Sequence, residues 1–267
     1  MKIVTIAINT FSSFLRDKLI ILFGILFACV VLMMMTSLLG MKAVNSGPNA
    51  HQMQSYVLSF VAAIMSLVSG CGSLLAAWAA ADTVASEMKS GTILAVMARP
   101  VHRWEFIAGK FLGVMLLMAV YVTMMFALSY LLAWMGGEKI QSSPWVLLVY
   151  PLVRYAIYAA MAMLLVTVIH PVLAFAAVLA ISVAANVVDP AQQYSNMFWT
   201  WVRNVLYVVL PSTALLSEEK FLVITHATLK QTTWIEHLTV IAYGLDYALV
   251  FLLFAMWSFH SRTLKRD

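Results

Sequence analysis

Long runs of apolar residues constrain this chain more than any other feature. The six runs are residues 19–39, 53–81, 111–137, 145–169, 171–188 and 238–259. Four of them carry no charge, the fourth contains only Arg154 and the sixth only Asp246. A helix needs about 20 predominantly apolar residues to cross the hydrocarbon layer of a bilayer. The sequence therefore predicts six membrane-spanning helices.

The composition excludes a soluble globular protein. Of 267 residues, 63% are hydrophobic and 10% are charged, whereas soluble domains carry about 25% charged residues. So little charge cannot cover a surface in water, which means that the chain needs lipid as its solvent. We predict an all-α, polytopic membrane protein with a single transmembrane domain over residues 1–267.

Two further helices are predicted outside the six spans. Residues 1–18 form an amphipathic pattern that is typical of a helix lying in the membrane surface. Its polar face is Lys2, Thr5, Asn9, Ser12, Ser13 and Arg16. Residues 197–210 are apolar and aromatic and end at Pro211. We expect them to form a re-entrant or interfacial helix, because a seventh span would place the basic C-terminal tail outside.

The distribution of basic residues predicts the orientation. With both termini inside, ten of the 16 Lys and Arg residues fall in cytoplasmic segments, as the positive-inside rule requires. This places residues 82–110 in the cytoplasm and residues 189–237 outside, in a multi-pass protein of the inner (plasma) membrane. The net charge of +5 thus reports orientation and does not indicate binding of nucleic acid. We also expect the first span to be retained, since residues 1–18 do not resemble a signal peptide.

No catalytic or metal-binding motif is present in the sequence. It lacks a phosphate-binding loop, a His-Glu-x-x-His motif and a Gly-x-Ser-x-Gly motif, so we predict no catalytic residue and no cofactor in this chain. Cys29 and Cys71 lie inside predicted spans and form no Cys-x-x-Cys pair, which predicts buried thiols rather than a metal site. The 18 methionines are interpreted as flexible packing residues.

Arg154 and Asp246 are the charges predicted inside the membrane. Both helices enter from the outside, and at 1.5 Å per residue the two charges lie roughly 12–14 Å along them. We predict that they form an ion pair. The alternative is that Arg154 extends outward and that Asp246 faces a wet cavity or a second subunit.

Small residues crowd one half of the second span and allow close helix contacts. They are Gly70, Gly72, Ser73, Ala76, Ala77, Ala79, Ala80 and Ala81. This stripe is predicted to pack within the chain, with a subunit interface as the alternative.

The segment between the second and third spans carries the most specific pattern. It contains Glu87, then Gly91-Thr92, a short apolar stretch, Arg99-Pro100-Val101, Arg103, and Gly109-Lys110 at the start of the third span. This order and spacing resemble the signature of the type-two ABC exporter permeases. Among these, the chain is similar to permeases associated with copper-enzyme maturation.

The resemblance implies a six-span permease subunit with an N-terminal elbow helix, residues 1–18, and a re-entrant region before the last span. Such a permease works with two copies of a separate ABC ATPase, which binds ATP and Mg, and with a second permease copy or a paralogue. Residues 82–110 would be the cytoplasmic coupling loop held in a groove of the ATPase. The residues assigned to coupling are Glu87, Gly91, Thr92, Arg99, Pro100, Arg103 and Lys110. The alternative is a basic loop that only fixes topology.

Two other functions remain open at this point. An ion-gradient-driven secondary transporter would use Arg154 and Asp246 as its coupling site. A non-transporting scaffold or mechanotransmitter would act through residues 189–237 on an extracytoplasmic partner. No feature separates lipid, peptide, drug or sulfur species as the substrate.

Overall fold

A computed structural model of the chain describes residues 2–18, 50–90, 102–136, 144–187, 210–216 and 234–261, together with single positions or pairs within 21–36 and 197–205. These residues are helical apart from short turns and bends, and they include no strand. The elements are α1 (Lys2–Phe14), α3 (Ala50–Ser90), α5 (Arg103–Gly136), α6 (Pro144–Val166), α7 (Pro171–Val187), the short 3-10 helix η1 (Thr213–Leu216) and α10 (Trp234–Ser261). The predicted all-α class is confirmed.

Four helices are long and apolar enough to cross a bilayer. Their apolar stretches are Ser66–Glu87, Trp104–Leu128, Leu148–Val166 and Trp234–Phe259. They correspond to the second, third, fourth and sixth predicted spans. The fifth prediction coincides with α7, an apolar helix of only 17 residues. The first prediction, residues 19–39, lies largely outside the described residues.

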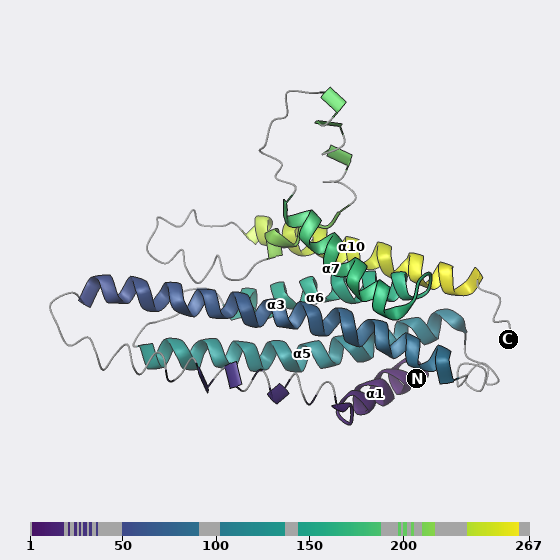
Figure 1. Cartoon of the computed structure of the whole chain (residues 1–267), viewed down its shortest axis with the longest axis horizontal. Helices are drawn as coiled ribbons and strands as arrows, with labels where there is room; N and C mark the ends of the chain where they lie inside the picture. Colours follow the sequence, from purple (N-terminus) through teal and green to yellow (C-terminus); the bar gives the residue numbers. More distant parts are fainter. Residues whose placement is uncertain are drawn as a thin grey trace.

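Helices α3, α5 and α6 run alongside one another, with α7 and α10 against α6 and with α1 against α5 (Figure 1). Helices α3 and α5 contain 41 and 34 residues, which corresponds to about 60 Å and about 50 Å of helix. Both therefore extend beyond a hydrocarbon layer of about 30 Å. The last turns of α3, the first turns of α5 and the last turns of α10 lie toward the same end of the bundle as α1, on the right in Figure 1. We call this the α1 end of the bundle.

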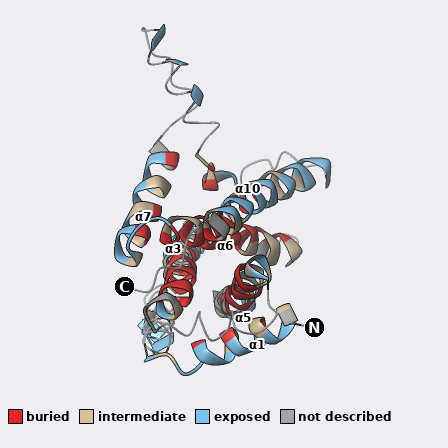
Figure 2. Cartoon of the chain, turned by 90° about the vertical axis from the view of Figure 1, so that its right-hand side faces the viewer, coloured by how far each residue is buried: buried red, intermediate tan, exposed pale blue. Residues whose placement is uncertain are grey.

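The core is centred on α6. In α6, 78% of the apolar stretch is buried inside the chain, against 17% in α10. Figure 2 shows the buried residues concentrated on α3, α5 and α6. The alanines of the small-residue stripe, from Ala76 to Ala81, are at most 2% exposed, and α3 contacts α5, α6 and α7. Apart from Gly70, which is exposed and has open space around it, the stripe therefore packs within the chain, as predicted.

Glycines allow two of these helix contacts to be very close. A Cβ atom on Gly72 of α3 would overlap the hydroxyl of Tyr155 on α6 and the ring of Tyr121 on α5. On α10, a Cβ atom on Gly244 would overlap Val153 of α6. Two helix axes can come this close only where one helix has a glycine at the contact, because glycine has no side chain.

The outward face of α10 is apolar along most of its length. Its exposed large side chains include Leu245, Leu249, Leu253, Phe254 and Trp257. In a membrane protein such a surface faces acyl chains, which solvate it as well as protein does. This surface therefore agrees with a membrane-spanning role for α10.

Both ends of the segment predicted as the coupling loop, 82–110, are helical. Residues 82–90 continue α3, and residues 103–110 belong to α5. Their charges led to the prediction of a loop, but helices continue past the point where the chain leaves the apolar layer. The remaining residues, 91–101, lie outside the described part of the chain.

The end of the predicted extracytoplasmic segment, 189–237, is also helical, because α10 begins at Trp234. Within the predicted helix 197–210, each described position up to 205 is helical. Met197 and Phe198 are 91% and 65% exposed. These positions agree with a helix at the surface of the chain, and its re-entrant or interfacial path stays a prediction.

Candidate functional site

Helix α5 begins at a capped N-terminus. The backbone N–H of His102 donates a hydrogen bond of 2.9 Å to Oε2 of Glu105, which is half of a capping box. The first helical bond follows, from the N–H of Phe106 to the carbonyl of His102 at 3.3 Å. A carboxylate in the first turn also interacts favourably with the helix dipole. The start of α5 is thereby fixed just after residues 91–101.

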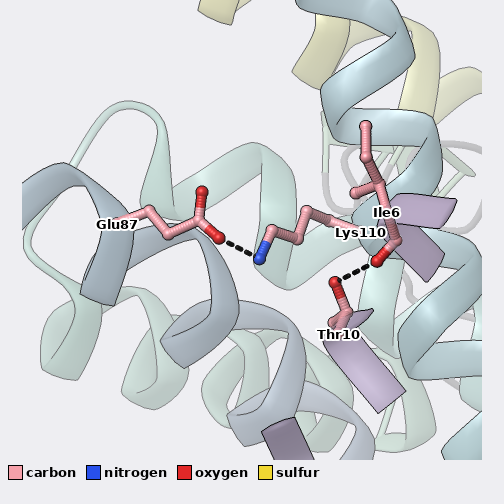
Figure 3. A network of polar contacts seen from close by, with 4 residues as sticks. All are labelled: Ile6, Thr10, Glu87 and Lys110. Atoms are coloured by element: carbon pink, nitrogen blue, oxygen red, sulfur yellow. Dashed lines mark hydrogen bonds and ion pairs between the residues drawn. The ribbon is translucent and has the colours of Figure 1, made fainter. Parts of the chain in front are cut away.

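An ion pair joins α3 to α5 at the α1 end of the bundle. Nζ of Lys110 contacts Oε1 of Glu87 (Figure 3). The two side chains are 10% and 23% exposed, and salt screens such a partly buried pair less than a surface pair. Because the two residues flank residues 91–101 in the sequence, the ion pair joins the two helices that lead into and out of that segment. We call this ion pair the base of residues 91–101.

Aromatic contacts connect the same base to α10. Nζ of Lys110 lies 5.6 Å from the ring centroid of Phe106, within the range of a cation–π interaction. Phe106 in turn stacks on Phe259 of α10, with 5.8 Å between ring centroids. Both rings are only 1% exposed. Helices α3, α5 and α10 therefore meet around Lys110.

Helix α1 packs on the same part of α5. Ile6 lies against Gly109, and Thr10 lies against Gly113. Figure 3 shows Ile6 and Thr10 beside Lys110, on the side away from Glu87. The predicted elbow helix is thus packed on the first turns of α5, beside Lys110, and its place in the membrane surface stays a prediction.

The structure brings together two of the seven residues assigned to coupling, Glu87 and Lys110. Arg103 is the first residue of α5. The other four lie outside the described residues, and their roles stay predictions: Gly91, Thr92, Arg99 and Pro100.

The two charges predicted inside the membrane differ in their surroundings. Arg154 on α6 is 7% exposed, and its guanidinium lies 5.7 Å from the ring centroid of Tyr155. Asp246 on α10 is exposed. Among the described residues an ion pair joins Glu87 to Lys110, and none joins Arg154 to Asp246.

Helix rotation explains why the two charges do not meet. Gly244 is one of the α10 residues that pack directly against α6. Successive residues are about 100° apart around a helix axis, so Asp246 points about 200° away from Gly244. The prediction of an ion pair considered depth along the helices and left out this rotation.

Polar contacts between helices were missed at the sequence level, among them three made by two tyrosines of α6. The hydroxyl of Tyr158 on α6 donates to Oγ of Ser182 on α7 at 3.1 Å and lies 3.2 Å from Oγ1 of Thr213 in η1. The hydroxyl of Tyr150 on α6 lies 2.7 Å from Nδ1 of His237 on α10. Hydroxyl residues within apolar runs were the available signal, but sequence alone does not pair them.

A metal site finds no support in the residues that the structure describes, where no three His, Cys, Asp or Glu side chains gather. Cys29 is an exposed free thiol and Cys71 a partly buried one. The expected burial of both thiols is therefore wrong for Cys29, whose side chain lies on the outer surface.

Comparison with known proteins identifies the family of this chain. A family model described as ABC-2 family transporter protein matches residues 4–264. The chain belongs to the ABC-2 transporter family. This ABC-2 permease is thus a multi-pass membrane subunit of an ABC transporter, and the family predicted from the pattern between Glu87 and Lys110 is confirmed. The likeness to permeases of copper-enzyme maturation stays a prediction, and a search of the curated proteins found no match.

Proposed function

We propose that this ABC-2 permease is the membrane half of an exporter whose separate ATPase docks on residues 82–110. ATP hydrolysis would then drive export of a substrate or its extraction from the bilayer. The observation that carries the proposal is the ion pair between Glu87 and Lys110. It holds the end of α3 to the start of α5, so the two helices that flank residues 91–101 are fixed relative to each other.

The helices beyond this base suit the transmission of force. Helix α5 starts at a fixed cap, and both α3 and α5 continue unbroken through the apolar stretches Ser66–Glu87 and Trp104–Leu128. A push on residues 91–101 therefore reaches two membrane-spanning helices at once. Two ATPase copies would supply ATP and Mg, since this chain has no phosphate-binding loop of its own.

The α1 end of the bundle faces the cytoplasm in this proposal. Helix α1 and the last turns of α10 lie at that end (Figure 1), which is consistent with both termini on one side. The excess of Lys and Arg in the segments assigned to that side, ten of 16, supports the cytoplasmic assignment. The substrate then leaves toward residues 189–237.

A second permease copy or a paralogue completes the complex. Asp246 lies exposed on α10, which has the smallest buried share, 17%, of the four long apolar helices that the structure describes. Ionisable residues within membranes are costly and rarely face lipid. A second permease against this face of α10 would remove Asp246 from the acyl chains, which supports the pairing.

The ion-gradient alternative loses its structural basis. It required Arg154 and Asp246 to act as one coupling site, but Arg154 is buried near Tyr155 and Asp246 is exposed. Membership of the ABC-2 family also favours a transporter driven by ATP.

Substitution of the ion pair tests the proposal. Glu87→Ala and Lys110→Ala should leave the permease in the membrane but reduce its stimulation of the ATPase about tenfold, because a charged hydrogen-bonded contact contributes roughly 1.5–3 kcal/mol. Glu236→Ala is the matched control, since Glu236 is an exposed carboxylate in the first turn of α10. Co-purification and ATPase rate are measured in nanodiscs. Wild-type stimulation in both ion-pair variants would overturn the proposed coupling role.

A further inference from the structure

Helix α1 has three sides, although its sequence predicts two. Residues packed on α5 share one side, and all of them are buried or partly buried: Ile3, Ile6, Ala7, Thr10 and Phe14. A second side is apolar yet more than half exposed: Val4, Ile8 and Leu15. The third side is polar and exposed: Thr5, Asn9, Ser12, Ser13 and Arg16. At about 100° per residue, the three sides divide the helix into roughly equal thirds.

The packed side of α1 approaches α5 at two glycines. A Cβ atom on Gly109 would lie 2.8 Å from Cβ of Ile6, and one on Gly113 would lie 2.6 Å from Cβ of Thr10. The four-residue spacing places both glycines on one side of α5, as in other close helix pairs. We call Gly109 and Gly113 the glycine seat.

The contact at the glycine seat leaves no hydroxyl unsatisfied. Thr10 is 2% exposed, and its Oγ1 donates to the carbonyl of Ile6 at 2.8 Å. Its methyl group is therefore the part directed at the seat, where a Cβ on Gly113 would lie 2.8 Å from Cγ2. At the glycine seat, close packing rather than a polar bond holds α1 against α5.

Lys110 connects this seat to the ion pair. It follows Gly109 directly in α5, and Figure 3 shows it between the α1 residues and Glu87. Its side chain is 10% exposed, since α1 and α3 lie on either side of it. The backbone that carries Lys110 is therefore held in place by the helix seated on its neighbours.

We propose that α1 is a positioning element for the coupling site. Seated on Gly109 and Gly113, it holds Lys110 opposite Glu87, and its displacement separates Lys110 from Glu87. The consequence for transport rests on the proposed function. The positioning of Lys110 by α1 is a property of the permease and does not depend on the ATPase. The exposed apolar side of α1 contacts acyl chains, so a shift of α1 in the membrane surface reaches the ion pair.

A double-mutant cycle on the purified full-length permease tests this positioning. Thermal unfolding in nanodiscs is measured for Glu87→Gln, Lys110→Met and the double variant. In the wild-type background the two shifts in Tm should be non-additive, because the residues interact. The cycle is then repeated with the seat filled, Gly109→Ala with Gly113→Ala, and separately with the seated side chain shortened, Ile6→Ala. In both backgrounds the non-additive part should disappear.

Two matched controls use the same chemical changes elsewhere. Ile8→Ala shortens an isoleucine on the exposed apolar side of α1, where the side chain is 56% exposed. Gly70→Ala adds a methyl group where no atom lies within 4 Å. Both should keep the non-additivity. Its persistence with the seat filled and with Ile6 shortened would overturn the proposal, and so would its loss in the two controls. Because Ile6→Ala adds no bulk, the test stands even if the filled seat prevents folding.

An ATPase measurement separates this inference from the proposed function. Seat variants that lose the non-additivity should also lose stimulation of the ATPase. If the cycle changes as expected while stimulation stays at the wild-type level, α1 positions Lys110 but the coupling role of the base is wrong. If the cycle does not change, the positioning itself is wrong, whatever the ATPase does.

Discussion

Replacing Gly72 with alanine tests the closest helix contact of the core. The added Cβ would overlap the hydroxyl of Tyr155 and the ring of Tyr121. Tyr155 cannot retreat freely, because it is fully buried and its hydroxyl donates to the carbonyl of Ser69 at 3.2 Å. The hydroxyl of Tyr121 likewise donates to the carbonyl of Val68 at 2.6 Å. Both tyrosines thus anchor the stretch of α3 that contains the glycine.

The size of the effect follows from three contributions. Alanine favours a helix over glycine by roughly 0.5–1 kcal/mol. Overpacking costs about 1–3 kcal/mol, and loss of the hydrogen bond from Tyr155 costs about 1 kcal/mol. The two unfavourable contributions therefore exceed the gain in helix propensity, and the free energy of unfolding should fall by about 2 kcal/mol.

Reversible unfolding of the purified permease in bicelles measures this change. Gly70→Ala is the matched control: the same helix gains the same methyl group in open space, so it should be neutral or up to about 1 kcal/mol more stable. Adding Tyr155→Phe to Gly72→Ala should restore part of the loss, because it removes the atom closest to the new methyl group. If Gly72→Ala proves as stable as Gly70→Ala, the close packing of α3 against α5 and α6 is refuted.

Three other substitutions probe separate contacts. Gly244→Ala should lower the free energy of unfolding by about 1–3 kcal/mol, because its Cβ would overlap Val153; unchanged stability would contradict the close contact of α10 with α6. Glu105→Ala should cost about 0.5–2 kcal/mol through loss of the bond from the His102 N–H, and faster hydrogen exchange confined to the start of α5 should report it. Phe259→Ala should cost about 3–5 kcal/mol, since its ring is 1% exposed; a change below 1 kcal/mol in the same unfolding assay would show that the aromatic contact is not formed.

Hydropathy located the long spans because length and apolar content suffice to place a helix in lipid. It could not assign partners, because acyl chains and protein side chains accept a methyl group equally well. The apolar face of α1 illustrates this limit. Ile6 and Ile8 are the same residue type on two sides of one helix, and sequence alone does not tell which side meets protein: Ile6 packs on Gly109 and Ile8 is 56% exposed.

The candidate site was predicted in part for a related reason. The family pattern marked Glu87 and Lys110, but as members of a loop rather than as partners across two helices. Their contact depends on how far α3 and α5 continue past the apolar layer. Likewise, Arg154 and Asp246 were placed at one depth, and only the rotation of α10 shows that Asp246 faces away from α6.

The distribution of burial indicates which span should move when the coupling segment is pushed. Among the four long apolar helices that the structure describes, the buried share of the apolar stretch is highest in α6, 78%, and lowest in α10, 17%, which favours α10 as the one that moves. The contact between Phe106 and Phe259 connects α10 to the base at Lys110. We therefore expect α10 to shift relative to α6 during the ATPase cycle, while α3 and α6 keep their separation. Spin labels at Leu249 and Leu116, both exposed, would report α10 against the bundle with and without ATP. The same distance in both states would show that α10 is fixed and that force follows another helix.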